Sequence, residues 1–167
     1  GKIKRALIFD CDVHQGDGTA TILQDIPEIT TCSIHCEKNF PQRKATSNID
    51  IEVTAHTGDN EYLSIVKNTL EMAIIESKPD LVIYDAGVDI YHHDPLGLLD
   101  ISLTGIRARD ALVIKTVRNQ NIPLATVIGG GYDKDQQALA ERHAIVVEEA
   151  FAYIKQDKRR IKLQPGV

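Results

Sequence analysis

Residues 6–16 read ALIFDCDVHQG, a short apolar run that leads directly into two acids and a histidine. Similar apolar runs follow at Ile29 to Ile34, Leu81 to Tyr84 and Leu124 to Ile128. Each run is bounded by turn residues, and such continuous apolarity is typical of strands that are covered on both faces. We therefore predict a parallel sheet whose first strand is Ala6 to Phe9.

The segments between these runs have helical periodicity. In the first, the apolar residues Leu63, Val66, Leu70, Ala73 and Ile74 recur on one helix face. Asp59 is the expected cap of this helix and Thr104 the expected cap of the next. The second helix should carry inward Ile106, Val113, Ile114 and Val117, and a last helix from about Lys134 to Lys155 should bury Leu139, Val146, Ala150 and Tyr153.

Alternating strands and helices predict an α/β fold in which helices cover both faces of a parallel sheet. Asn48 to Val53 alternates polar and apolar residues, so it is a weaker strand candidate at an edge or in a loop. No repeat or composition break indicates a second domain. We expect residues 1–167 to form one domain or part of one, with a basic tail from about 155 to 167.

The composition narrows the class of protein. A chain of 167 residues with 43% hydrophobic residues can bury a real core. Its net charge of -5 argues against a nucleic-acid partner, and no apolar run is long enough to indicate a membrane partner. Cys11, Cys32 and Cys36 show no disulfide framework, so the expected location is the cytoplasm, or the nucleus of a eukaryote.

Chemically active residues follow the strands at the sheet edge where ligands gather in open α/β folds. Asp12 and His14 are two residues apart, so in extended backbone they project to the same side as a potential zinc-binding pair. Asp89 follows the third apolar run and could complete a site of one histidine and two carboxylates. Gly129 to Tyr132 follows the fourth run, where glycines let the backbone approach a ligand and a phenol is presented beside it.

Three segments resemble the C-terminal signature blocks of the histone deacetylase and acetylpolyamine amidohydrolase superfamily: 10–18, 85–97 and 129–132. The resemblance extends from about Ala6 to Ala150. It is closest to class IV because Gln15 stands where many relatives have a second histidine. This resemblance implies an arginase/deacetylase-like fold, here without its N-terminal part.

The resemblance also implies roles for individual residues. Asp12, His14 and Asp89 would bind Zn²⁺, and the Tyr132 hydroxyl would stabilise the oxyanion formed from the substrate carbonyl. The outer carboxylates Asp10 and Asp17 would orient two tandem histidines. The remaining assignments are a monovalent-cation site for K⁺ at Asp10, Ser33 and the Ile34 carbonyl, the acyl-tunnel wall at Phe40, and substrate contacts at Gly130 and Gly131.

The chain departs from the family pattern in its histidines. In the family, the tandem pair lies on the chain before the block that starts at Asp10. In this sequence almost nothing precedes that block. The pair His92-His93 follows Asp89, and we interpret it as loop or rim residues. The expected activity is zinc-dependent hydrolysis of an acyl-lysine or acylpolyamine amide, impaired in this chain alone because the general base is absent.

Other interpretations remain open from the sequence. A ureohydrolase has similar acid and histidine blocks but binds two metal ions, and a metal-stabilised binding module would lack turnover altogether. A chain without half of its fold should also leave sheet edges bare. We therefore expect self-association or pairing with the missing N-terminal half.

Overall fold

The computed structural model describes the backbone of residues 1–162 and the side chains of residues 1–156. It contains a five-stranded parallel sheet with the strand order β3-β2-β1-β4-β5. The strands are β1 Ala6–Asp10, β2 Ile29–Cys36, β3 Ile49–Val53, β4 Leu81–Asp85 and β5 Leu124–Val127. All four apolar runs are strands, and the weaker candidate forms the edge strand β3.

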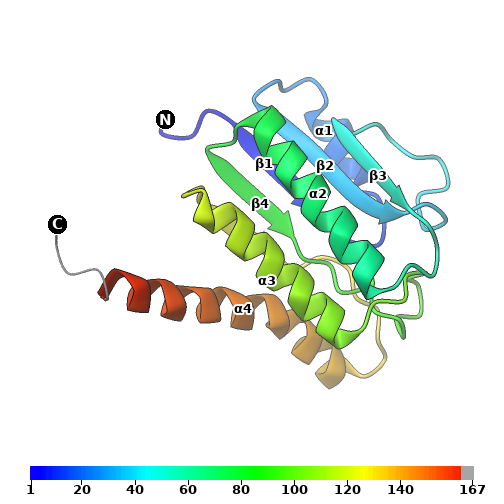
Figure 1. Cartoon of the computed structure of the whole chain (residues 1–167). Helices are drawn as coiled ribbons and strands as arrows, with labels where there is room; N and C mark the ends of the chain where they lie inside the picture. The colour runs from blue at the N-terminus through cyan, green and yellow to red at the C-terminus, as the bar shows by residue number, and fades with distance from the viewer. Residues whose placement is uncertain (163–167) are drawn as a thin grey trace.

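The helices are α1 Asp17–Leu23, α2 Asp59–Ser77, α3 Leu103–Asn119 and α4 Gln136–Lys162. Figure 1 shows α2 and α3 side by side in front of the sheet and α1 behind it, so both faces carry a helix. Helix α4 packs along α3 and extends beyond the sheet. The predicted fold class, a parallel sheet with helices on both faces, is confirmed.

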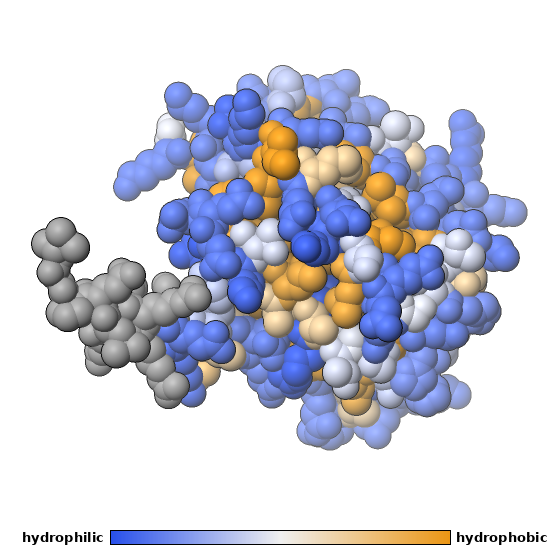
Figure 2. Space-filling model, viewed as in Figure 1, coloured by the Kyte–Doolittle hydropathy of each residue, from blue (hydrophilic) through white to orange (hydrophobic). Residues whose placement is uncertain are grey.

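The core lies between the sheet and the helices in front of it. Phe9 of β1, Tyr62 and Leu70 of α2, Tyr84 of β4 and Ile106 of α3 are all fully buried. Most residues on the face drawn in Figure 2 are hydrophilic, and apolar residues show near the middle of this face. Within residues 1–162, no helix is long and apolar enough to cross a membrane.

The predicted helix caps are wrong. Gly58 is the N-cap of α2, and Asp59 is its first residue. The Asp59 carboxylate instead accepts hydrogen bonds from the backbone N–H and the hydroxyl of Ser102, at 2.8 and 2.5 Å. Ser102 rather than Thr104 caps α3, because its hydroxyl accepts a hydrogen bond from the Gly105 N–H at 3.0 Å. The starts of α2 and α3 are thereby joined.

Helix α4 is longer than the sequence indicated, since it continues to Lys162. Its predicted inner stripe packs against the core, with Val146 buried and Leu139, Ala150 and Tyr153 partly buried. The first residues of the predicted basic tail are therefore helical. The side chains of residues 157–162 and the whole of 163–167 lie outside the described residues.

Candidate metal centre

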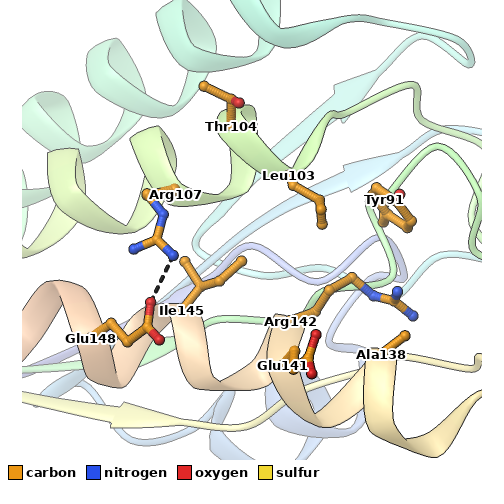
Figure 3. A pocket seen from close by; sticks show the side chains of 9 residues that line it. All are labelled: Tyr91, Leu103, Thr104, Arg107, Ala138, Glu141, Arg142, Ile145 and Glu148. Atoms are coloured by element: carbon orange, nitrogen blue, oxygen red, sulfur yellow. Dashed lines mark hydrogen bonds and ion pairs between the residues drawn. The ribbon is translucent and has the colours of Figure 1, made fainter.

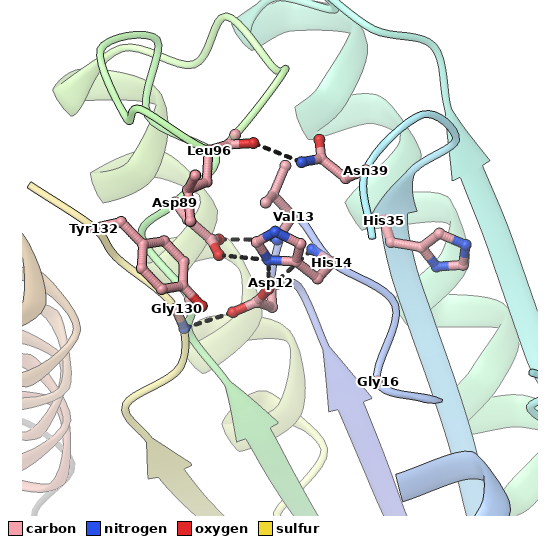
Figure 4. Close-up of polar contacts among 12 residues, drawn as sticks. Asp12, Val13, His14, Gly16, His35, Asn39, Asp89, Leu96, Gly130 and Tyr132 are labelled. Carbon is pink, nitrogen blue, oxygen red and sulfur yellow. Dashed lines mark hydrogen bonds and ion pairs between the residues drawn. The ribbon is translucent and has the colours of Figure 1, made fainter. Parts of the chain in front are cut away.

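Asp12, His14 and Asp89 converge on one point beyond the carboxyl ends of β1 and β4 (Figure 4). Each offers a ligand atom, and these atoms lie within 4.8 Å of one another. The His14 Nδ1 atom lies 3.0 Å from Oδ1 of Asp12 and 3.0 Å from Oδ2 of Asp89. The structure thus brings together the three residues that the sequence indicated.

Backbone amides hold both carboxylates in place. Asp12 accepts hydrogen bonds from the His14 N–H at 2.9 Å and from the Gly130 N–H at 2.5 Å. Asp89, which is fully buried, accepts a hydrogen bond from the Val13 N–H at 2.9 Å. Each carboxylate therefore accepts at least one hydrogen bond from a loop other than its own, which links the loops after β1, β4 and β5.

The loop after β5 comes too close to the acids for any residue but glycine at position 130. A Cβ atom there would collide with the Asp89 carboxylate and lie 2.6 Å from Oδ2 of Asp12. Gly87 is similarly confined, because a Cβ atom would lie 2.8 Å from the Asp12 Cα. Close backbone approach is what the glycine run was expected to provide.

The charges at this point favour a bound cation. Hydrogen bonds to Asp12 and Asp89 raise the pKa of His14 to about 10. Burial raises the pKa of Asp89 to about 7. Without a metal, His14 therefore carries a proton at neutral pH, and this proton offsets the negative charge of its neighbours.

Two further acids lie beneath the three converging residues. Asp10 accepts a hydrogen bond from the Asp12 N–H at 2.9 Å, and burial together with the nearby charge of Asp85 raises its pKa well above the usual value. Burial raises the pKa of Asp85 to about 6, and its Oδ1 atom is buried without a hydrogen-bond partner. A bound cation would reduce the repulsion between these buried carboxylates.

Asp10 and Ser33 line a cavity of about 10 Å³ between β1, β2 and the start of α1, large enough for a single water molecule or a small ion. The Ser33 hydroxyl lies 3.0 Å from Nδ1 of His35. His35 belongs to β2, and Figure 4 shows its ring away from the converging residues. The Ile34 side chain has no atom that could bind a cation, so only its backbone carbonyl could serve as a ligand.

Tyr132 lies beside the converging residues. Its ring is perpendicular to the His14 ring, with the ring centroids 5.9 Å apart (Figure 4). Its N–H donates a hydrogen bond to Asp94 at 2.9 Å, and Asp94 also accepts from the Leu96 N–H at 2.9 Å. Asp94 therefore fixes the loop that carries the phenol.

The other predicted site residues lie farther from the three converging side chains or contact them only through the backbone. The Phe40 carbonyl accepts a hydrogen bond from the Gln15 N–H at 3.3 Å, next to His14, and its ring is 68% exposed. Asp17 is the first residue of α1 and makes no side-chain hydrogen bond to Asp12, His14 or Asp89. His92 and His93 are exposed loop residues, as predicted.

The sequence interpretation missed Arg109 and Asp110. Both are buried in α3, where Arg109 bonds to the loops after β1 and β4. A signal was available, because the spacing of Ile106 and Val113 places positions 109 and 110 on the buried face. A charged pair on such a face is unusual and indicates a specific role.

A hollow lies away from the acids, between α3 and α4 (Figure 3). It has a volume of about 550 Å³, and its wall includes the ion pair between Arg107 and Glu148 at 2.7 Å. Arg142, stacked on Tyr91 at 4.7 Å and paired with Asp133 at 2.7 Å, forms another wall. None of the converging acids lines it.

Comparisons with known proteins agree with this geometry. The chain is 47% identical to an uncharacterized protein of Picosynechococcus sp. (strain ATCC 27264 / PCC 7002 / PR-6), covering 87% of this chain and 49% of that protein. It is 41% identical to histone deacetylase 2 of Arabidopsis thaliana, covering 80% of this chain and 35% of that protein. The chain thus spans half or less of these relatives' lengths.

Solved structures show the same fold. An acetylpolyamine aminohydrolase from Burkholderia pseudomallei superimposes with a TM-score of 0.73 at 17% identity, covering 89% of this chain and 45% of that one. The histone deacetylase Clr3 superimposes with a TM-score of 0.74 at 21% identity, covering 90% of this chain and 27% of that one. The family described as the histone deacetylase domain matches residues 1–149. The chain therefore belongs to the histone deacetylase domain family.

Proposed function

We propose that this chain forms the metal-binding and oxyanion-stabilising part of a zinc-dependent deacylase that hydrolyses the amide of an acylated amine. The observation that carries the proposal is the convergence of the Asp12, His14 and Asp89 ligand atoms within 4.8 Å. Membership of the histone deacetylase domain family supports deacetylase-type chemistry.

The three residues fit zinc in type and in spacing. Imidazole nitrogen and carboxylate oxygen are its usual ligands together with thiolate, and ligand atoms in a tetrahedral site with bonds of about 2.0 Å lie about 3.3 Å apart. The His14 Nδ1 atom lies 3.0 Å from each acid, so a small outward movement suffices. When bound, zinc would polarise the substrate carbonyl and lower the pKa of a water molecule.

Tyr132 would donate its hydroxyl proton to the oxygen on which negative charge develops. Partial burial, followed by the charges of Asp12, Asp89 and Asp94, raises the pKa of the Tyr132 phenol. The hydroxyl therefore stays protonated at neutral pH, as a hydrogen-bond donor must. The path of the acyl group would be lined by Phe40, Gly130 and Gly131. Asp17 would orient the tandem histidines of the deacetylase fold.

We propose that the general base comes from the rest of the deacetylase fold. Among the described residues, His14 is the only histidine in the ligand group, and the exposed pair His92-His93 lies in another loop. Hydrolysis needs a base to take a proton from water and return one to the leaving amine. Acyl-lysine and acylpolyamine are the proposed substrates, because the matched relatives are named for histones and acetylpolyamines.

The remainder of the fold would pair with β5. Both edges of the sheet are free in the described residues, but they differ: β3 exposes the charged residues Asp50 and Glu52, whereas Val127 and Ile128 at β5 are 43% and 69% exposed. Charged edges resist pairing, and apolar edges invite it. The chain spans 49% of the Picosynechococcus protein, which leaves enough sequence in that relative to supply further strands.

A potassium ion is the proposed occupant of the small cavity beside Asp10. The Ser33 hydroxyl lines the same cavity, and the Ile34 carbonyl would be the third ligand. Burial raises the pKa of Asp10, and a cation would keep this carboxylate ionised.

The test of the proposed function is metal content followed by complementation. We expect the chain, loaded from an equimolar mixture of zinc and manganese and then desalted, to retain one zinc ion. Asp89→Ala should lose it, whereas Asp100→Ala, which changes an exposed acid of the same connection between β4 and α3, should not. Two bound manganese ions would contradict the proposal in favour of a ureohydrolase, although the matched family is the deacetylase one.

For complementation, the chain is combined with the part of the Picosynechococcus protein that it does not match. We expect hydrolysis of an acetyl-lysine peptide or an acetylpolyamine by the combined protein and its loss in Tyr132→Phe. If the combined protein binds zinc but does not hydrolyse either substrate, the chain is instead a metal-stabilised binding module.

A further inference from the structure

We propose that Arg109 is a positioning residue of the metal centre: its guanidinium joins the loop that carries Asp12 to the loop that carries Asp89. The inference rests on the proposed function, which treats these two acids as metal ligands. Arg109 does not itself touch the ligand atoms. It would act by setting the separation of the two loops.

Direct pairing between β1 and β4 ends just before the two loops. The last backbone hydrogen bond that joins them here runs from the Cys11 N–H to the Asp85 carbonyl, at 3.1 Å. Beyond this point the segments after β1 and β4 turn toward the ligand atoms, and their buried carbonyls need other hydrogen-bond partners. Asp12 and Asp89 thus lie where hydrogen bonds of the sheet no longer set the distance between these two segments.

Arg109 supplies those partners. Its Nη1 donates to the Cys11 carbonyl at 3.2 Å and to the Gly87 carbonyl at 2.7 Å, and its Nη2 approaches the Ala86 carbonyl at 3.3 Å. Cys11 directly precedes Asp12, and Gly87 lies two residues before Asp89. One rigid, planar group therefore bonds to both ligand loops at once.

The guanidinium is itself held firmly. Its Nε donates to Oδ1 of Asp110 at 2.9 Å, and the same oxygen accepts a hydrogen bond from the Tyr84 hydroxyl at 2.6 Å. Arg109 and Asp110 are 0% and 1% exposed. A buried ion pair is often no more stabilising than apolar residues of similar volume, so general stability alone does not account for this one.

The experiment measures zinc affinity and cobalt spectra in variants of the full chain. Arg109→Met/Asp110→Leu removes the ion pair without leaving an unpaired buried charge, and Arg109→Lys keeps the charge without the planar group. Arg107→Met is the matched control, because it removes an exposed arginine of the same helix whose partners are Glu148 and Glu149.

We expect the double variant to bind zinc about 10- to 100-fold more weakly, the range seen when groups that support metal ligands are lost. Arg109→Lys should weaken binding severalfold, and both should change the visible spectrum of the Co²⁺-substituted protein, which reports ligand geometry rather than stability. Arg107→Met should match the wild type in both measurements.

Wild-type zinc affinity and an unchanged cobalt spectrum in the folded double variant would overturn the inference and leave the proposed function intact. If the double variant does not fold, Arg109→Lys decides, and wild-type behaviour of that variant would likewise overturn the inference. If the wild-type chain itself takes up no metal, the proposed function fails, and the role of Arg109 fails with it.

Discussion

Single residues in the loop after β5 tolerate little change because this loop touches both acids. At Gly130 a side chain would collide with the carboxylates of Asp12 and Asp89, and the Gly130 N–H is itself a hydrogen-bond donor to Asp12. The pattern Gly-Gly-Gly-Tyr indicated a close approach, but the sequence could not show which atoms are approached. That information lies in the packing of three loops against one another.

Gly130→Ala should therefore abolish zinc binding, because the added methyl group must displace the carboxylates that bind the metal. Gly18→Ala is the matched control, since a Cβ atom at Gly18 meets nothing within 4 Å and alanine favours helix. The measurement is the zinc content of the desalted variants. Retention of a full equivalent of zinc by Gly130→Ala would show that the loop can move aside at no cost to the site.

Among the helices, the junction of α2 and α3 departs most from expectation. Both predicted caps lie one or two residues from the real N-caps. Ser102 caps α3 through a local contact with Gly105, whereas the Asp59 carboxylate binds Ser102 of the other helix start. Sequence patterns identify capping residues from local neighbours, whereas Asp59 and Ser102 are 43 residues apart. A local rule has no access to such a contact.

Ser102→Ala should lower the free energy of unfolding by about 1 to 2 kcal/mol, because it removes an N-cap and a partner of Asp59. Thr104→Ala, at the position first expected to cap α3, should change it by less than about 0.5 kcal/mol, since Thr104 is exposed. Urea unfolding followed by circular dichroism gives both values. Equal losses in the two variants would restore Thr104 as the effective cap.

For the molecule as a whole, the edge of β5 should govern association. The exposed Val127 and Ile128 lie on a free parallel edge, and isolated chains can bury such an edge against each other. We expect the chain alone to self-associate in a concentration-dependent way, measured by sedimentation velocity.

Val127→Lys/Ile128→Lys should shift this equilibrium toward the monomer. Ile75→Lys, at an apolar residue of α2 that is 71% exposed, should leave it unchanged. Addition of the complementary part of the Picosynechococcus protein should compete with self-association of the wild type. A wild-type chain that stays monomeric at all concentrations tested would contradict this expectation.

The sequence by itself determined the sheet, the order of its main strands along the chain and the identity of the three converging residues. Continuous apolar runs are strands because they are buried on both faces, and polar residues that follow them necessarily meet at one edge. Thus the sequence alone identifies Asp12, His14 and Asp89 as the residues that converge.

Only the tertiary structure decided how these residues are held. The three carbonyls that bind Arg109, the amide of Gly130 that binds Asp12 and the contact of Asp94 with the Tyr132 loop all join segments distant in sequence. Backbone groups carry no sequence signal, because every residue type has the same carbonyl and nearly every one the same amide. Which of them meet is settled only when the loops pack together.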